Sequence, residues 1–273
     1  MASTGFKTLT PEKLKDYMAR HTEKESALIE VRQPDEYTEA HIPGSRLFPL
    51  MDLQAKVFDL PTDQDLIFYC HIGGRSAFAA DLAAEAEVTE KNVFTLDGGI
   101  MAWDGTTLAD YPRVQVFDSS RDFHSLLLTA MDLEKGAYRF YLQALERFGN
   151  DSIADTLETL SQAETAHARM IYKHWKDSAD NPEPFEALFE NLGGDILEGG
   201  QTLAEALHQL EKIGKNPCLR VMELAMTIEY AAYDLYRNMA DRTGDEDVKA
   251  VLLSIAQAEK GHMRTLVKAL GKC

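Results

Sequence analysis

Two patterns of apolar residues follow one another along this chain of 273 residues. Up to about residue 112, short apolar runs alternate with helical stretches and with turns rich in glycine and proline. Three runs, at 26–31, 65–70 and 91–96, have the length and composition of buried strands. Because strands that alternate with helices usually form a parallel sheet covered by helices, we expect residues 1–115 to form an α/β domain.

From about residue 118 onward, apolar residues recur at the three- and four-residue spacing of amphipathic helices. Breaks rich in glycine, asparagine and proline divide this part into four long predicted helices, at 121–148, 151–177, 217–242 and 245–270. Residues 182–215 are expected to form shorter helix and loop, long enough to cross from one end of a bundle to the other. The pattern therefore predicts an all-α four-helix bundle over residues 116–273.

The helical part also contains an internal repeat. A shift of 95 residues aligns its two halves without a gap. The matching positions include acidic, aromatic and imidazole side chains: Glu134 with Glu229, Tyr141 with Tyr236, Glu164 with Glu259, and His167 with His262. Two related helical hairpins would form a pseudo-symmetric bundle.

The net charge of −17 is spread over both parts of the chain. An acidic protein lacks the basic surface that binds phosphate backbones, which argues against a nucleic-acid partner. The first residues lack the apolar core of a signal peptide, and no later stretch reaches membrane-spanning length. A cytoplasmic protein without a membrane partner is the expectation.

The three cysteines, Cys70, Cys218 and Cys273, are far apart in the sequence and include no Cys-x-x-Cys pair. We therefore expect neither a disulfide framework nor an iron site with four cysteine ligands. No role is predicted for Cys218 or Cys273.

Cys70 stands where a predicted strand ends and a tight loop leads into an alanine-rich helix at about Ser76. Backbone N–H groups in such a loop, with the positive end of the helix, would favour a nucleophilic thiolate. Gly73 and Gly74 allow the necessary curvature, and Arg75 adds a positive charge that could hold an anionic substrate. Taken by itself, a cysteine at a strand end is more often simply buried, so the surrounding residues decide between the two interpretations.

Four motifs around this loop resemble the single-domain rhodanese family, in the same order and over residues 5–112. They are Glu30-Val31-Arg32, His41-Ile42-Pro43-Gly44-Ser45, the Cys-x-x-Gly-x-Arg loop at 70–75, and Gly98-Gly99 followed by Trp103. The resemblance implies a rhodanese-like sulfurtransferase with Cys70 as the sulfur acceptor. The six-residue loop has the length found in sulfurtransferases rather than the longer one of related phosphatases, and His71 stands where the family often has arginine.

Two Glu-x-x-His pairs lie on the predicted second and fourth long helices. Residues three apart project from one helix face, which brings Glu164 together with His167, and Glu259 together with His262. One such pair is common on a solvated acidic helix. Here both pairs recur at the repeat spacing, each 30 residues after a glutamate amid apolar neighbours, Glu134 or Glu229. Several carboxylates directed into one bundle interior require a cation between them.

This arrangement resembles the rubrerythrin branch of the ferritin-like superfamily over residues 120–270. The resemblance implies a di-iron centre, with Glu164 and Glu259 bridging, Glu134 and Glu229 terminal, and one histidine on each iron. Oxygen and imidazole ligands suit iron, or manganese as the alternative, better than zinc. Ala232 stands where the family usually has a further glutamate, and the four-cysteine electron-transfer tail is missing, so an external electron donor is expected. The repeated tyrosines at 138, 141, 233 and 236 either hydrogen-bond the ligands or pack in the core.

Together the two resemblances imply a sulfurtransferase fused to a di-iron oxidoreductase. Its expected partners are a sulfane-sulfur donor, a thiol or cyanide acceptor, and peroxide or oxygen; its expected state is a homodimer. The alternative is a non-catalytic sulfur carrier fused to an iron-storage or iron-sensing bundle.

Overall fold

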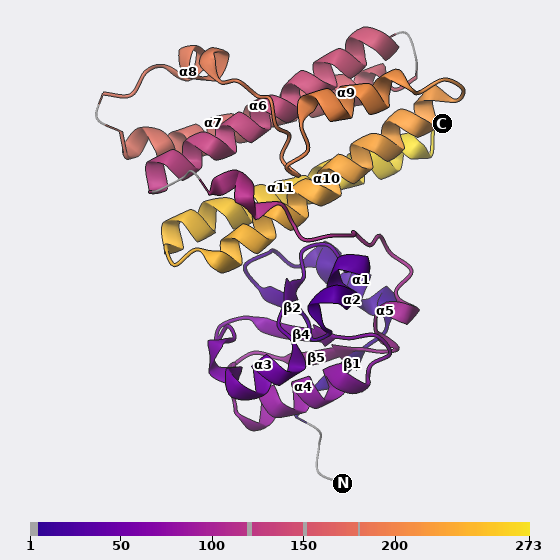
Figure 1. Ribbon diagram of the computed structural model, residues 1–273, viewed down its shortest axis with the longest axis vertical. Coiled ribbons are helices and arrows are strands. Elements are labelled where there is room, and N and C mark those ends of the chain that lie inside the picture. The colour runs from indigo at the N-terminus through magenta and orange to yellow at the C-terminus, as the bar shows by residue number, and fades with distance from the viewer. Residues whose placement is uncertain (1–4, 119–121, 150–151, 180) are drawn as a thin grey trace. The chain divides into compact units, whose positions relative to one another are not determined.

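The chain divides into two units, Met1–Tyr111 and Pro112–Cys273. The computed structural model describes residues 5–118, 122–149, 152–179 and 181–273. Figure 1 shows an α/β unit followed by a helical one. Among the residues described, no helix is long and apolar enough to span a membrane.

The first unit contains one five-stranded sheet in the order β1-β5-β4-β2-β3, and all four strand pairs are parallel. The strands are β1 (Lys7–Leu9), β2 (Ser26–Glu30), β3 (Arg46–Leu47), β4 (Asp65–Tyr69) and β5 (Val93–Leu96). The predicted parallel sheet is confirmed. The three central strands, β2, β4 and β5, coincide with the apolar runs because both of their faces are buried.

Helices cover both faces of this sheet. They are α1 (Pro11–Arg20), α2 (Pro34–Glu39), α3 (Leu50–Ala55), α4 (Gly74–Glu85) and α5 (Gly99–Ala102). Leu53 of α3 and Ala80 of α4 share one apolar cluster with Ile29 and Phe68. Leu14 of α1 belongs to a second cluster, together with the alternate strand residues Leu28 and Ile67. Side chains that alternate between two faces of a strand thus build two cores around one sheet.

The second unit is built on four long helices, α6 (Phe123–Phe148), α7 (Ala154–Asp177), α10 (Pro217–Arg242) and α11 (Glu246–Leu270). Helix α6 packs mainly on α7, and α10 mainly on α11, which gives the two hairpins that the repeat predicted (Figure 1). Side-chain caps begin two of the helices: Asp122 accepts from Ser125 N at the start of α6, and Asp245 accepts from Val248 N at the start of α11.

The crossover between the hairpins contains two short helices, α8 (Phe185–Asn191) and α9 (Leu203–Glu211). The predicted combination of short helix and loop at 182–215 is therefore confirmed. Two apolar clusters fill the bundle. Leu133 belongs to one of them and Ala137 to the other, so that Glu134 lies at the boundary between the two clusters.

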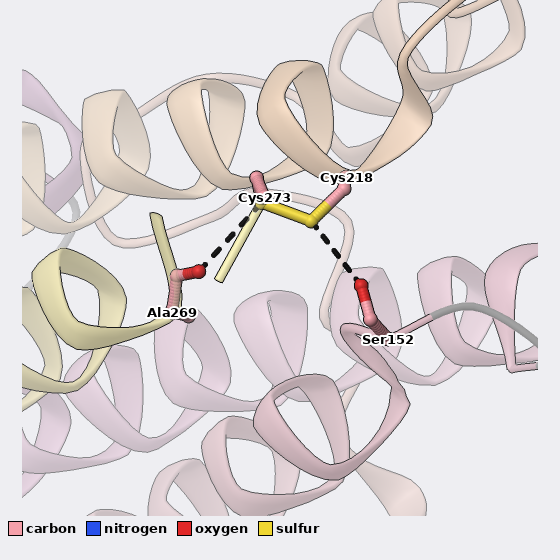
Figure 2. The surroundings of a disulfide bond; sticks show 4 residues. All are labelled: Ser152, Cys218, Ala269 and Cys273. Carbon is pink, nitrogen blue, oxygen red and sulfur yellow. Dashed lines mark hydrogen bonds between the residues drawn. A yellow bond between two sulfur atoms is a disulfide. The ribbon is translucent and has the colours of Figure 1, made fainter. Parts of the chain in front are cut away.

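Cys218 and Cys273 form a disulfide across 55 residues of sequence (Figure 2). The expectation that the chain has no disulfide framework was wrong, because this bond joins two of its three cysteines. Cys218 lies at the start of α10 and Cys273 follows the end of α11; because these antiparallel helices are nearly equal in length, the two ends meet. The Ser152 hydroxyl lies 3.5 Å from Cys218 Sγ. Cys70 is the remaining free cysteine.

Candidate functional site

The first candidate site surrounds Cys70, which follows β4 directly and is buried. Strand β2 ends beside β4, since Glu30 pairs with Tyr69, so the loops that follow both strands meet at the carboxyl edge of the sheet. The N–H of Gly73 donates to Cys70 Sγ at 3.2 Å. Gly73, the N-cap residue just before α4, has φ +100°, a left-handed conformation that favours glycine.

Hydrogen bonds to the sulfur favour its charged form. Burial alone would raise the pKa of the Cys70 thiol, but hydrogen bonds from the Ser76 hydroxyl and from the backbone of Ser76, Gly73 and Ile72 lower it below its ordinary value. Thr95 Oγ1 donates to Ser76 Oγ at 2.9 Å and so holds that hydroxyl in place. The loop therefore stabilises a thiolate, the nucleophilic form of cysteine.

The segment that follows Gly98-Gly99 forms backbone hydrogen bonds with the cysteine loop. Ile100 N donates to Cys70 O at 2.8 Å, and Met101 N donates to His71 O at 3.1 Å. A Cβ at Gly99 would come within 2.3 Å of Cys70 O. Glycine is required here because the two backbones pass so close together.

Arg75 lies beside the loop but already has a partner. Its guanidinium donates two hydrogen bonds to Glu36, at 2.6 and 2.7 Å, and this pairing lowers the pKa of Glu36 to about 2. Arg75 also interacts electrostatically with Cys70. Sequence reasoning missed Glu36 because α2 is far from the loop in the sequence. His71 is exposed.

The other two rhodanese-like motifs form a buried network rather than lining the sulfur. Arg32 and Tyr69 both donate to the Glu30 carboxylate. The Tyr69 hydroxyl also accepts from Ile42 N at 3.1 Å and lies 2.7 Å from Ser45 Oγ. These bonds tie the end of β2 to the His-Ile-Pro-Gly-Ser turn, and their role is to hold the loops of this edge in place.

The second candidate site lies inside the helical bundle. The structure brings together the six predicted ligands, which we call the donor cluster; all six are buried. They are Glu134 of α6, Glu164 and His167 of α7, Glu229 of α10, and Glu259 and His262 of α11.

Distances within the donor cluster follow the pseudo-symmetry of the repeat. His167 Nδ1 lies 3.3 Å from Glu134, 3.5 Å from Glu164 and 3.4 Å from Glu259. His262 Nδ1 lies 2.8 Å from Glu229, 3.1 Å from Glu259 and 3.4 Å from Glu164. Glu164 and Glu259 thus contact both histidines, whereas Glu134 and Glu229 contact one each. The imidazole rings stack at 4.7 Å between centroids.

Two tyrosines donate to the outer carboxylates. Tyr236 donates to Glu134 Oε1 at 2.9 Å, and Tyr141 donates to Glu229 Oε1. Burial and the nearby carboxylates raise the pKa of both phenols well above 10, so both remain hydrogen-bond donors. Tyr138, by contrast, packs its ring against Phe189. The sequence left open whether these tyrosines hydrogen-bond the ligands or pack in the core. Tyr141 and Tyr236 hydrogen-bond the ligands.

Among the described residues, the basic groups paired with the carboxylates of the donor cluster are the two histidines. Burial raises the pKa of Glu164 to about 7 and that of Glu229 to about 8. Burial would lower the pKa of both histidines, but the surrounding carboxylates raise it well above its usual value. Both oxygens of Glu164 and of Glu259 are buried without a hydrogen bond among the described residues. Buried oxygens that lack donors are the chemistry of a site for metal ions.

Sequence reasoning missed a fifth carboxylate, Glu198, which is fully buried on the crossover between α8 and α9. One oxygen of Glu198 belongs to a group of potential ligand atoms that all lie within 4.8 Å of one another, with Glu134, Glu164, His167 and Glu259. Burial and these carboxylates raise the pKa of Glu198 well above its ordinary value. The repeat contains no partner for Glu198 and so could not reveal it.

Two family models match this chain. The rhodanese-like domain matches residues 10–106, and rubrerythrin matches residues 125–270. The second match covers more than half of the chain, and both support the fusion of two domains.

Curated relatives share sequence over about a third of the chain. The chain is 38% identical over 98 residues to the probable adenylyltransferase/sulfurtransferase MoeZ of Mycobacterium tuberculosis. The matched segment covers 35% of this chain and 24% of that protein. It is 34% identical to the uncharacterized protein YqhL of Bacillus subtilis, over 37% of this chain and 74% of that protein. It is 31% identical to the thiosulfate sulfurtransferase GlpE of Pseudoalteromonas translucida, over 30% of this chain and 77% of that protein.

The chain spans about a quarter of the length of MoeZ but about three quarters of YqhL and GlpE. The rhodanese-like domain thus has sulfurtransferases among its relatives, and the bundle has the fold and buried donor set of an iron-binding domain. The chain therefore belongs to the rubrerythrin family and carries a rhodanese-like domain ahead of its rubrerythrin domain.

Proposed function

We propose that this chain is an enzyme with two centres: a sulfurtransferase that uses Cys70, and a di-iron oxidoreductase that reduces peroxide or oxygen in the bundle. The hydrogen-bonded Cys70 sulfur carries the first half of this proposal. The buried donor cluster carries the second half.

In the sulfur reaction, the Cys70 thiolate attacks the outer sulfur of thiosulfate or of another sulfane donor. With thiosulfate, a new S–S bond forms on Cys70, the old S–S bond breaks, and sulfite leaves with the bonding electron pair. A thiol or cyanide then takes the outer sulfur from the persulfide and restores the thiolate. The donor at Gly73 N and the N-terminus of α4 stabilise the anionic sulfur in both forms.

The names of relatives support this chemistry, since GlpE is a thiosulfate sulfurtransferase and MoeZ a probable sulfurtransferase. The test is steady-state turnover of thiosulfate and cyanide to sulfite and thiocyanate. Cys70→Ala should abolish turnover, and Cys273→Ala, in the other unit, should retain it. If Cys70→Ala turns over at the rate of the unmodified protein, the sulfur half of the proposal is wrong.

In the bundle, the donor cluster would hold two iron ions. Glu134 and His167 would serve one ion and Glu229 and His262 the other, while Glu164 and Glu259, which contact both histidines, would serve both. Bound iron would supply the redox chemistry for reducing peroxide to water, a reaction that takes two electrons, restored by an external donor, and two protons. Tyr236 and Tyr141 orient the outer carboxylates, while the apolar clusters around the site limit access of water.

The test is peroxide consumption by iron-loaded protein together with an external reductant. Glu164→Ala should lose most of the activity because it removes a carboxylate that contacts both histidines. Glu158→Ala, an exposed glutamate on the same helix, is the matched control. If iron-loaded protein binds two metals yet consumes no peroxide, the bundle stores or senses iron instead.

A further inference from the structure

Glu198 is an acidic residue in an unusual place. It belongs to the crossover rather than to any of the four long helices, yet none of its surface is exposed. No N–H or hydroxyl group among the described residues donates to either of its carboxylate oxygens, and the polar group beside them is another carboxylate, Glu134. A buried carboxylate without a donor destabilises a fold unless a cation compensates it.

The backbone around Glu198 forms a tight turn that directs this residue inward. Ile196 and Thr202 form an antiparallel bridge. Within it, Leu197 N donates to Gln201 O, and Gly200 N donates to Leu197 O, both at 2.8 Å. Gly200 has φ +77°, so the turn requires a residue that adopts the left-handed conformation.

Two glycines let the turn approach the long helices closely. A Cβ at Gly136 of α6 would lie 2.1 Å from Ile196 O, and a Cβ at Gly199 would lie 2.5 Å from the Ala231 Cβ of α10. The turn is thus packed between α6 and α10, the two helices that carry the outer carboxylates Glu134 and Glu229.

Side chains of α6 form hydrogen bonds with residues 194–195, the segment that leads into the turn. Gly194 N donates to Asp132 Oδ1 at 2.9 Å, and Arg139 donates to Gly194 O at 3.0 Å and to Asp195 Oδ1 at 2.9 Å. These contacts determine the position of the turn, and with it the position of the Glu198 carboxylate. The position of Glu198 is therefore built into the fold.

We propose that Glu198 is a seventh ligand of the metal centre. It would bind the same metal ion as Glu134 and His167. This inference rests on the proposed di-iron site. Its ligand oxygen shares one compact group with donor atoms of Glu134, His167, Glu164 and Glu259, whereas Glu229 and His262 lie outside that group. The two metal positions are consequently unequal: one has an additional carboxylate, and the other has none.

An extra negative charge should make the position beside Glu134 and His167 bind its metal more tightly than its counterpart. Removing that carboxylate should weaken one of two binding steps and leave the other nearly unchanged. Loss of a residue that fixes a metal site typically costs 10- to 100-fold in affinity, and we expect at least about tenfold for a ligand.

The experiment is anaerobic titration of the full metal-free chain with Fe(II) and, separately, with Mn(II), with bound metal counted by elemental analysis. The variants are Glu198→Gln and Glu198→Leu; the second is needed because an amide oxygen can still coordinate. Glu190→Gln, an exposed glutamate of α8, is the matched control. We expect two metals per chain in the parent and control, and one dissociation constant raised at least about tenfold in Glu198→Leu.

Thermal unfolding separates a ligand from a structural residue. Replacing Glu198 should raise the melting temperature of the metal-free protein, because a buried uncompensated carboxylate is removed, and lower that of the metal-loaded protein. If the parent binds two metals and both variants bind them with unchanged constants, Glu198 is not a ligand and the di-iron proposal stands. If the parent binds no metal, both proposals fail.

Discussion

The Tyr236 hydroxyl, on α10, donates to Oε1 of Glu134, on α6, at 2.9 Å. The repeat reproduces this contact in the opposite direction, because Tyr141 of α6 donates to Glu229 of α10. Each helical hairpin thus orients a carboxylate that belongs to the other, and the donor cluster depends on both hairpins being correctly packed.

Tyr236→Phe should weaken metal binding by about tenfold, because loss of a partner of a metal ligand typically has an effect of this size. It should also lower the free energy of unfolding of the loaded protein by about 1.5–3 kcal/mol, the contribution of a hydrogen bond to a charged group. Metal titration and chemical denaturation measure the two effects. Tyr138→Phe, whose ring packs on Phe189, is the control; equal binding by both variants would contradict the assigned role of Tyr236.

Removal of metal should destabilise the bundle selectively. Metal present at 100 times its dissociation constant stabilises the state that binds it by about 2.7 kcal/mol per site. Chelation should therefore lower the thermal midpoint measured by helical circular dichroism, while sulfur transfer by Cys70 at moderate temperature stays unchanged. Glu164→Ala, which removes a carboxylate that contacts both histidines, should lose most of the metal-dependent shift. A full shift that persists in this variant would place the metal elsewhere.

Alkylation of Cys70 by iodoacetamide should have its pH midpoint below the ordinary thiol value of about 8.5, because the pKa of Cys70 is lowered. The reactive thiolate exists above the midpoint and is lost as the pH falls through it. Ser76→Ala removes a donor to the anion and should move the midpoint to higher pH. Mass spectrometry assigns the label to Cys70. Ser254→Ala, whose hydroxyl bonds only its own helix at Ala250 O among the contacts described, should leave the profile unchanged.

The unfolded chain should titrate one thiol before reduction and three after it, because Cys218 and Cys273 are paired and Cys70 is free. Reduction, or Cys218→Ser, should lower the free energy of unfolding of the bundle by about 2–4 kcal/mol, since the disulfide closes a long loop of the unfolded chain. Cys70→Ser should leave that unit unaffected. Three thiols in the oxidised, unfolded protein would contradict the pairing.

Gly136→Ala should destabilise the bundle by about 1–3 kcal/mol, because the new methyl group meets the Ile196 carbonyl and displaces the crossover. Gly261→Ala is the matched control, since a Cβ there meets nothing within 4 Å and alanine favours a helix over glycine by about 1 kcal/mol. Opposite signs of the two changes in unfolding free energy are expected. If Gly136→Ala is neutral, the crossover does not depend on that close approach.

The sequence alone determined the local architecture of both units. Apolar runs predict β2, β4 and β5 because both faces of these strands are buried, and helical periodicity predicts α6, α7, α10 and α11 because each helix buries one stripe. The repeat of 95 residues also indicated which six side chains belong together, since two copies of one hairpin place equivalent residues in equivalent positions.

Only the tertiary structure decided the contacts between distant segments that share no periodicity. Glu198 lies beside the donor cluster because a glycine-lined turn passes between α6 and α10. Glu36 pairs with Arg75 across the sheet edge, and Cys218 meets Cys273 because two helices end together. Each of these contacts depends on how complete elements pack. Local spacing cannot encode such contacts, because spacing relates only residues on the same element or in equivalent copies of it.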